Sequence, residues 1–314
     1  MENKLSDKLT VGIVQASPVF MNLEASLAKA VALIEQAAAQ DAQLVAFGET
    51  WLAGYPAWLD YCPSAALWNH EPTKEVFAQL RRNSVVVQGA ETQTLGETAA
   101  KHNIVLIIGI NERVERGAGN GTLYNSLLTF GANGKLLNHH RKLVPTYTER
   151  LVWGQGDATG LEAVETDFGR VGSLVCWEHW MPLARQAMHN SGEHIHVAVF
   201  PTVHETHQIA SRHYALEGRC FVLAAGLLMK AADLPAPLLS ETDLSKLPEN
   251  ILRGGSCIVA PDGEFVARPV FDEETIIVAE LDLMRIDKEK MTLDVSGHYS
   301  RPDVFDFAVN RKSR

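Results

Sequence analysis

The chain has 314 residues, of which 46% are hydrophobic, and it carries a formal net charge of −10. A chain of this length can bury a large core, either as one large domain or as two fused halves. The acidic balance argues against nucleic-acid and anionic-membrane partners, because both select for clustered lysine and arginine. We therefore expect a protein that acts on small molecules.

The N-terminal stretch MENKLSDKLT is polar and lacks the apolar centre of a signal peptide. No later stretch holds about 18 uncharged apolar residues in a row, which a membrane-spanning helix would need. The four cysteines are widely spaced and form no CxxC pair, so neither a disulfide framework nor a zinc ribbon is indicated: Cys62, Cys176, Cys220 and Cys257. These features predict a cytoplasmic protein with reduced thiols.

The first part of the chain predicts a strand, a helix and a second strand. Residues 9–16 and 43–49 are apolar runs typical of buried strands. Asn22 is a candidate N-cap for the helix between them, whose apolar residues recur at helical spacing: Leu23, Leu27, Ala30 and Ile34. Residues 51–72, rich in Trp, Tyr and Pro, predict a long ordered loop with one short helical turn.

The rest of the chain continues the mixture of strands and helices. We predict helices over residues 92–102, from Pro182 onward and over 206–219. Strands are predicted over 103–113, 122–130, 135–143, two short segments of 161–176, 196–201, 220–228, 254–260, 264–270 and 274–283, with hairpin turns at 131–134 and 261–263. The pattern indicates an α/β protein, and two halves of similar length are compatible with two sheets covered by helices.

Three stretches place a polar residue at the end of an apolar strand, where sites in α/β sheets usually lie: LVAFGETWLAGYP, NHHRKLVPTYTERLVWGQGD and SLVCWEHWMP. The residues are Glu49, Lys142 and Cys176. A thiol can attack an electrophilic carbon, a carboxylate can take its proton, and an ammonium can stabilise developing negative charge. Taken singly, each residue also fits a packing cysteine, an ion-paired glutamate or a solvated lysine. The three act together only if their strands are neighbours.

The same three stretches resemble the nitrilase superfamily and, within it, the true nitrilase branch. The similarity runs from VGIVQASP through LYNSLLTFGANGKLLNHHRKL to GHYSRPDVF at residues 297–305, and CWEHW and VWGQGD favour nitrilases over the amidase and carbamoylase branches. The resemblance implies an α/β fold, a four-layer αββα sandwich of two mixed β-sheets covered by helices. It also implies a single carbon-nitrogen hydrolase domain over residues 1–314, whose segment from about 284 to 314 takes part in subunit contacts.

By this resemblance, the reaction is hydrolysis of an organic nitrile to the carboxylic acid and ammonia, with no metal and no other cofactor. Cys176 matches the nucleophile that forms a thioimidate and then a thioester, Glu49 the general base and Lys142 the catalytic lysine. Glu149 matches a second glutamate near that lysine, which could orient it and handle water. The backbone N–H of Trp177 would help Lys142 to stabilise negative charge.

Tyr55, Trp177 and Thr202 lie next to these strand ends and are candidates for the substrate pocket, although such aromatic residues are more often part of a core. The family resemblance implies a small-molecule nitrile as partner and a homo-oligomer, either a dimer or a larger spiral. Two alternatives stay open: an amidase or cyanide-hydrolysing relative with the same three residues, and a non-catalytic binding or assembly member. Loss of one of the three residues would favour the last alternative, and all three are present.

The chain departs from the family pattern at three places. Gly48 stands where proline is more common, residues 200–206 look shorter than the corresponding nitrilase loop, and a long C-terminal extension is missing after 297–305. The stretch HETHQIASRH does not match the zinc-binding HExxH pattern, because Gln208 stands where the second histidine is required. Its histidines are therefore expected to face solvent or to be satisfied in the core.

Overall fold

The computed structural model describes residues 8–240 and 242–311. Residues 1–7, which make up most of the polar N-terminal stretch, lie outside the described residues, as do residues 312–314 of the expected contact segment. Within the described ranges, no helix is long and apolar enough to cross a membrane.

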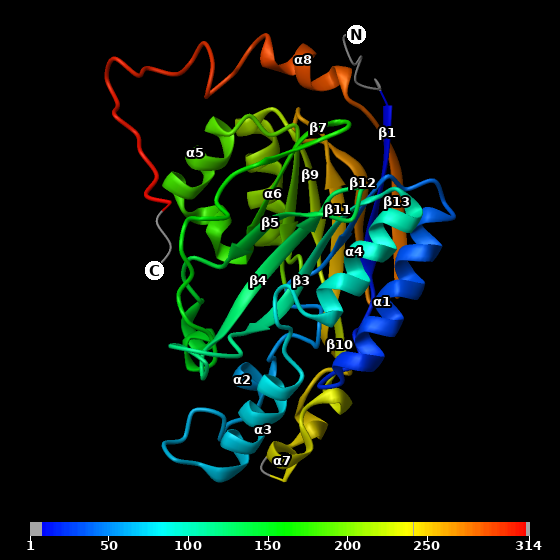
Figure 1. Ribbon diagram of the computed structural model, residues 1–314, viewed down its shortest axis with the longest axis vertical. Helices are drawn as coiled ribbons and strands as arrows, with labels where there is room; N and C mark the ends of the chain where they lie inside the picture. The colour runs from blue at the N-terminus through cyan, green and yellow to red at the C-terminus, as the bar shows by residue number, and fades with distance from the viewer. Residues whose placement is uncertain (1–7, 241, 312–314) are drawn as a thin grey trace.

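Two mixed sheets form the centre of the molecule (Figure 1). The first has the strand order β13-β1-β2-β3-β4-β5, in which β1, β2 and β3 run parallel and the other pairs are antiparallel. Its strands are β1 (Lys8–Gln15), β2 (Leu44–Phe47), β3 (Val105–Arg113), β4 (Leu123–Phe130), β5 (Leu136–Arg141) and β13 (Thr275–Asp282).

The second sheet has the order β10-β11-β9-β8-β7-β6, and β12 pairs with β11. Strands β7, β8 and β9 are parallel, and the remaining pairs are antiparallel. Its strands are β6 (Val164–Thr166), β7 (Gly169–Val175), β8 (Ile195–Val199), β9 (Phe221–Ala225), β10 (Leu228–Lys230), β11 (Asn250–Val259) and β12 (Phe265–Phe271).

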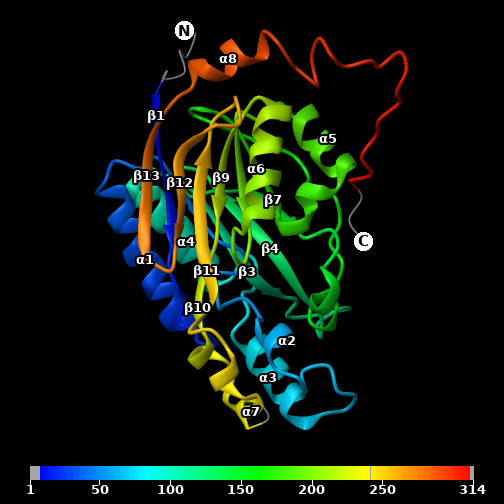
Figure 2. The ribbon, with the colours of Figure 1, turned by 180° about the vertical axis from the view of Figure 1, so that it is seen from behind.

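Helices cover the outer face of each sheet (Figures 1 and 2). The first sheet carries α1 (Leu23–Ala38) and α4 (Ala90–His102), and the second carries α5 (Pro182–Asn190) and α6 (Glu205–Gly218). Near one end lie α2 (Trp58–Tyr61), α3 (Glu71–Arg82) and α7 (Ala236–Leu239), whereas α8 (Met284–Lys290) lies at the other. Short 3-10 helices are η1 (Tyr147–Leu151), η2 (Cys176–Trp180), η3 (Ala231–Asp233) and η4 (Leu244–Lys246). The fold is the predicted αββα sandwich.

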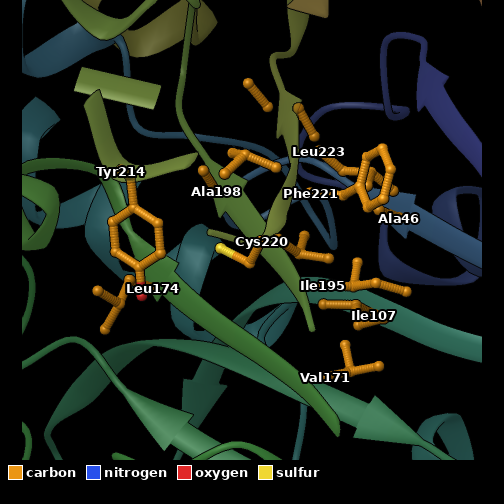
Figure 3. Close-up of a cluster of buried hydrophobic side chains, with 14 of the residues drawn as sticks. Ala46, Ile107, Val171, Leu174, Ile195, Ala198, Tyr214, Cys220, Phe221 and Leu223 are labelled. Atoms are coloured by element: carbon orange, nitrogen blue, oxygen red, sulfur yellow. The ribbon is translucent and has the colours of Figure 1, made fainter. Parts of the chain in front are cut away.

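The alternation of side chains along the strands divides the buried residues into two hydrophobic clusters. Ala46 and Ile107 from the first sheet belong to the same buried cluster as Val171 and Ile195 from the second (Figure 3). Phe47, next to Ala46 in the chain, belongs instead to the cluster that includes residues of α1 and α4. Because successive strand residues point to opposite faces, β2 contributes to both layers.

Helix α1 begins as the sequence predicts. The Asn22 side chain accepts a hydrogen bond of 3.0 Å from the backbone N–H of Ala25, which satisfies one of the first N–H groups of the helix. The hairpin turns at 131–134 and 261–263 are also confirmed, because each joins antiparallel strands. The cap and turn residues were therefore sufficient to predict where this helix begins and where these hairpins turn.

Two element predictions were wrong. Helix α3 was not predicted: its first residues overlap the expected 51–72 loop, and only Val76 and Leu80 are buried, with Phe77 partly buried beside them. The strand predicted over 220–228 is divided into β9 and β10. The chain leaves the sheet there because Leu227 N–H donates to the carbonyl of Pro201 instead of continuing the ladder.

Candidate active site

Glu49, Lys142 and Glu149 form one buried ionic cluster. The Lys142 ammonium lies 3.0 Å from Glu49 Oε1 and 2.6 Å from Glu149 Oε2. The three side chains are at most 3% exposed. Glu49 follows β2, Lys142 follows β5 and Glu149 belongs to η1. Although β3 and β4 separate β2 from β5 in the sheet, these strand ends bring the side chains together.

The two oxygens of Glu49 have different surroundings. Oε1 accepts hydrogen bonds from Lys142 and, at 2.6 Å, from the side-chain amide of Asn125 on β4. Oε2 is buried and has no hydrogen-bond partner among the described residues. One oxygen is therefore held in place while the other can exchange a proton with a bound molecule. Asn125 was not predicted as a site residue, since its strand gave no signal beyond its apolar pattern.

Burial raises the pKa of Glu49 to about 7, although the Lys142 ammonium acts in the opposite direction. For Lys142 itself, burial opposes the charged form, but the surrounding negative charges, first that of Glu49, raise its pKa above the ordinary value. The lysine therefore stays an ammonium, whereas the carboxyl group can take up and release a proton near neutral pH.

Glu149 uses both carboxylate oxygens within the protein. Oε1 accepts from the Tyr55 hydroxyl at 2.9 Å, and Oε2 accepts from Lys142 and from the Thr146 backbone N–H at 2.7 Å. This geometry fixes Glu149 against the Lys142 ammonium. Burial, followed by the charges of Glu149 and Glu49, raises the pKa of Tyr55 well above its ordinary value, so that its hydroxyl stays a donor.

Cys176 lies where β7 ends and η2 begins, with a φ of +52°, in the left-handed region that few residues other than glycine adopt. Strain of this kind is often found at functional sites. The thiol group is buried, and burial and the Glu49 charge raise its pKa well above the ordinary value, while Lys142 and the Trp177 backbone N–H lower it. The resting side chain is a thiol that needs a base to react.

A cavity of about 300 Å³ opens next to the cysteine. Cys176 and Glu149 line it, together with all three residues proposed from the sequence to contact substrate: Tyr55, Trp177 and Thr202. The Thr202 hydroxyl accepts a hydrogen bond of 3.0 Å from the Arg253 backbone N–H. The wall is formed by β11 of the second sheet and by the segments that follow β2, β5, β7 and β8.

His204 and His207 also line this cavity. Their stretch fails the zinc-binding pattern and overlaps the 200–206 loop, but neither histidine was predicted to line the pocket. His204 is exposed to solvent, as expected, and burial followed by the His204 charge lowers the pKa of His207 to about 4. A neutral imidazole therefore faces the pocket at neutral pH.

The family model for carbon-nitrogen hydrolases matches residues 10–290. The chain belongs to the carbon-nitrogen hydrolase family. It is 41% identical to "Nitrilase 2" from an unknown prokaryotic organism, over 98% of this chain and 94% of that protein. It is 38% identical to an "Aliphatic nitrilase" from Sinorhizobium fredii, over 98% of this chain and 97% of that protein. These relatives place the hydrolase in the nitrilase branch.

Solved structures confirm the sandwich fold of this hydrolase. Saccharomyces cerevisiae Nit3, described as a member of branch 10 of the nitrilase superfamily, aligns with a TM-score of 0.71 at 22% identity and covers 95% of this chain and 98% of its own. A carbon-nitrogen hydrolase from Helicobacter pylori aligns with a TM-score of 0.67 at 22% identity, over 91% and 93% of the two chains.

Two glycines of the hydrolase allow its backbone to pack closely around Glu49. A Cβ atom on Gly109 of β3 would lie 2.3 Å from the Thr50 nitrogen and 2.4 Å from the Gly48 carbonyl oxygen, both of them backbone atoms. At Gly48, which replaces the more common proline, a Cβ would lie 2.9 Å from a Leu227 methyl group. Gly48 therefore fits a site that the Leu227 side chain partly fills.

A second buried pair joins the two sheets of the hydrolase beside its site. Glu178 Oε1 accepts from the Leu143 backbone N–H at 2.8 Å, and Oε2 accepts from the Val175 N–H at 2.6 Å. His140 Nε2 lies 3.0 Å from Glu178 Oε2. Although burial opposes ionisation, His140 lowers the pKa of Glu178. Glu178 was predicted only as part of the CWEHW stretch, which gives no sign of these contacts.

Proposed function

We propose that this carbon-nitrogen hydrolase is a nitrilase, which converts an organic nitrile to its carboxylic acid and ammonia. The observation that carries the proposal is the arrangement of Glu49, Lys142 and Cys176. A buried ammonium is bonded to a carboxylate whose second oxygen has no partner among the described residues, and both groups act electrostatically on the thiol. The names of the relatives in the nitrilase branch support the same substrate class.

In the first half of the reaction, Cys176 Sγ attacks the nitrile carbon while Glu49 Oε2 takes the thiol proton and passes it to the nitrile nitrogen. The product is a thioimidate. Lys142 and the Trp177 backbone N–H stabilise the negative charge that develops on that nitrogen. The raised pKa of the Cys176 thiol supports this order, since the thiol keeps its proton until the ionised Glu49 carboxylate takes it.

In the second half, water adds to the thioimidate carbon with Glu49 as the base, and the resulting tetrahedral intermediate expels ammonia to leave a thioester. A second water hydrolyses the thioester to the acid and restores the Cys176 thiol. Each step returns its proton through the same carboxyl group, so no metal or organic cofactor is needed in this proposal. Lys142 serves both tetrahedral intermediates as the fixed positive charge.

We assign Glu149 the role of orienting Lys142, because both of its oxygens are already bonded within the protein. Tyr55, Trp177 and Thr202 would contact the substrate in the cavity. With about 300 Å³ and aromatic walls, the cavity has a size and character typical of a small organic ligand site.

We also propose that the hydrolase is a single domain over residues 1–314 that forms homo-oligomers and works in the cytoplasm. Four exposed apolar side chains on η2, α5 and α6 support assembly, and we call them the α5–α6 patch: Trp180, Leu183, Ile209 and Leu216. The segment from about 284 onward would add contacts. Four buried free cysteines are compatible with a reducing compartment.

The test is ammonia release from a panel of nitriles and their amides, with Cys176→Ala as the inactive variant. Cys257→Ala is the matched control, since Cys257 is also buried but lies in the core of the second sheet. We expect nitrile turnover in wild type and Cys257→Ala, and none in Cys176→Ala. Turnover of amides but not nitriles would contradict the nitrilase assignment, and activity in Cys176→Ala would contradict the mechanism.

A further inference from the structure

A line of buried polar side chains runs from Cys176 into the space between β8 and α6. His179 Nδ1 lies 2.7 Å from the carbonyl oxygen of Cys176, and its Nε2 lies 3.0 Å from His196 Nε2. His196 Nδ1 lies 2.8 Å from Glu193 Oε2, and the Tyr214 hydroxyl donates to the other oxygen of Glu193. These four side chains belong to residues at most 3% exposed. The mechanism proposed above uses none of them.

The hydrogen-bond partners determine where the protons lie. A backbone carbonyl and an ionised carboxylate can only accept, so Nδ1 of both His179 and His196 must donate. Of the two Nε2 atoms that face each other, one must donate and the other accept. The histidine pair therefore holds three N–H protons and one positive charge, which lies next to the Glu193 carboxylate. Although burial opposes it, His196 and then His189 keep the pKa of Glu193 well below its usual range, which supports the ionised form. His189 on α5 lies 3.3 Å from Glu193 Oε1, so the carboxylate faces a histidine from each side.

The two rings have different acceptors, because His196 Nδ1 faces the Glu193 carboxylate and His179 Nδ1 faces a neutral peptide carbonyl. Burial, and then the charge of His196, lower the pKa of His179 to about 3. The groups packed around His179 do not compete for its Nδ1 proton: the Phe200 ring lies 5.1 Å away, and Arg185 donates to the backbone carbonyl of His179. His179 is thus a neutral donor to the Cys176 carbonyl, with the His196–Glu193 pair behind it.

The accepted carbonyl belongs to the peptide unit that joins Cys176 to Trp177. The other half of this unit is the Trp177 N–H, which adjoins the Cys176 thiol and acts to lower its pKa. A hydrogen bond to the oxygen of a peptide draws electron density from its nitrogen, and so makes its N–H a stronger donor, because linked hydrogen bonds polarise one another. It also fixes the plane of the peptide, which a preorganised donor requires.

We propose that His179, His196 and Glu193 form a positioning relay, which orients the Cys176–Trp177 peptide and strengthens its N–H as a donor to the charge that develops on the substrate. The three side chains do not line the cavity and act only through this peptide. The inference rests on the proposed function in one respect: it takes the Trp177 N–H as a donor to that charge.

Two variants interrupt the relay without removing much volume. Glu193→Gln deletes the negative charge that holds the imidazolium, and His179→Asn can keep a donor near the Cys176 carbonyl but loses the link to His196. We expect each to lower kcat about tenfold with KM changed less than about twofold, because the lost stabilisation belongs to the transition state. The double variant should be no slower than His179→Asn alone, since Glu193 acts through His179.

Val197→Ala is the control for stability, because Val197 is the buried neighbour of His196 on β8 and makes no polar side-chain contact. It should lower the unfolding temperature without lowering kcat. The relay is refuted if Glu193→Gln keeps the wild-type kcat and only unfolds at a lower temperature. It is also refuted if the factors by which the two substitutions lower kcat multiply in the double variant. If wild type hydrolyses amides and not nitriles, the proposed function fails, and the same cycle measured on the amide still decides the relay.

Discussion

At the scale of single residues, the site depends on the different hydrogen bonding of the two carboxylate oxygens of Glu49. Oε1 is anchored by Lys142 and Asn125, and Oε2 has no hydrogen-bond partner in the described part of the chain. Burial raises the pKa of this carboxyl to about 7, because the Lys142 charge and the hydrogen bonds to Oε1 offset only part of the effect of burial. A base with this pKa can accept the Cys176 proton and still return it at neutral pH.

The raised pKa sets a direction for the pH profile. The carboxyl must be ionised to act as the base, so kcat/KM should fall as the pH drops through about 7. Asn125→Ala removes a hydrogen bond that lowers this pKa, so the acidic limb should move to higher pH, by less than about one unit. The measurement is the pH profile of kcat/KM from ammonia release.

Asn138→Ala serves as the control for that profile. Asn138 lies on β5 and its amide bonds only the backbone carbonyls of Gly160 and Glu162, so its removal should leave the acidic limb in place. An Asn125→Ala profile that coincides with wild type, or a limb that moves to lower pH, would show that Glu49 is not the group that titrates.

At the scale of elements, the approach of β2 to β3 decides where Glu49 points. Gly109→Ala would place a methyl group against the backbone of residues 48–50, which has no flexible side chain to move aside. We expect the free energy of unfolding to fall by about 1–3 kcal/mol and activity to be lost with it, as is typical of overpacking. Urea unfolding and ammonia release measure the two effects.

Gly121→Ala is the matched glycine substitution, because a Cβ there would meet nothing within 4 Å. Its stability should stay within about 0.5 kcal/mol of wild type, as for most surface changes. Equal losses in the two variants would mean that the close backbone contact at Gly109 does not determine the position of the β2 end.

The Glu178–His140 pair links elements of different sheets and allows a further prediction. Glu178→Gln removes the carboxylate that holds His140 and two backbone N–H groups, so the free energy of unfolding should fall by about 3 kcal/mol, as expected when one partner of a buried pair is lost. Urea unfolding gives the value. Glu75→Gln, on the exposed side of α3, is the control and should leave the free energy of unfolding almost unchanged. A Glu178→Gln protein as stable as wild type would contradict a structural role for the pair.

The elements show what sequence patterns can predict. The α1 helix and the hairpins were predictable because an N-cap residue or a turn sequence lies next to a regular repeat of apolar residues. Helix α3 was missed because only Val76 and Leu80 mark its buried side, which is too short a stripe to stand out. The contacts of Glu178 were invisible because they depend on two strand ends from different sheets.

At the scale of the whole molecule, the element pattern was compatible with two helix-covered sheets, and the family resemblance supplied the four-layer αββα arrangement. Periodicity gave strands and helices, but not the strand order that places β2 and β5 apart in one sheet. The meeting of Glu49 with Lys142 therefore could not be derived from their strands. His204 and His207 were not predicted at the cavity, because no pattern in their segment shows which side chains face it.

The α5–α6 patch leads to a prediction about assembly. Leu183 is 72% exposed on α5, which a salt bridge from Arg185 to Glu217 ties to α6. If the patch joins subunits, Leu183→Glu should shift the protein to a smaller species in sedimentation velocity, because a charge would be buried at the interface. Leu67→Glu, a similarly exposed leucine in the loop before α3, should sediment like wild type. Unchanged sedimentation of Leu183→Glu would place the interface elsewhere.

The bonds of Glu178 also constrain how the molecule opens. One carboxylate holds the Leu143 N–H just beyond β5 and the Val175 N–H of β7, although these strands belong to opposite sheets. Neither proton can reach solvent without disturbing the bond that protects the other. In hydrogen–deuterium exchange the two amides should therefore exchange from one shared opening, as a pair that reports separation of the sheets at the site.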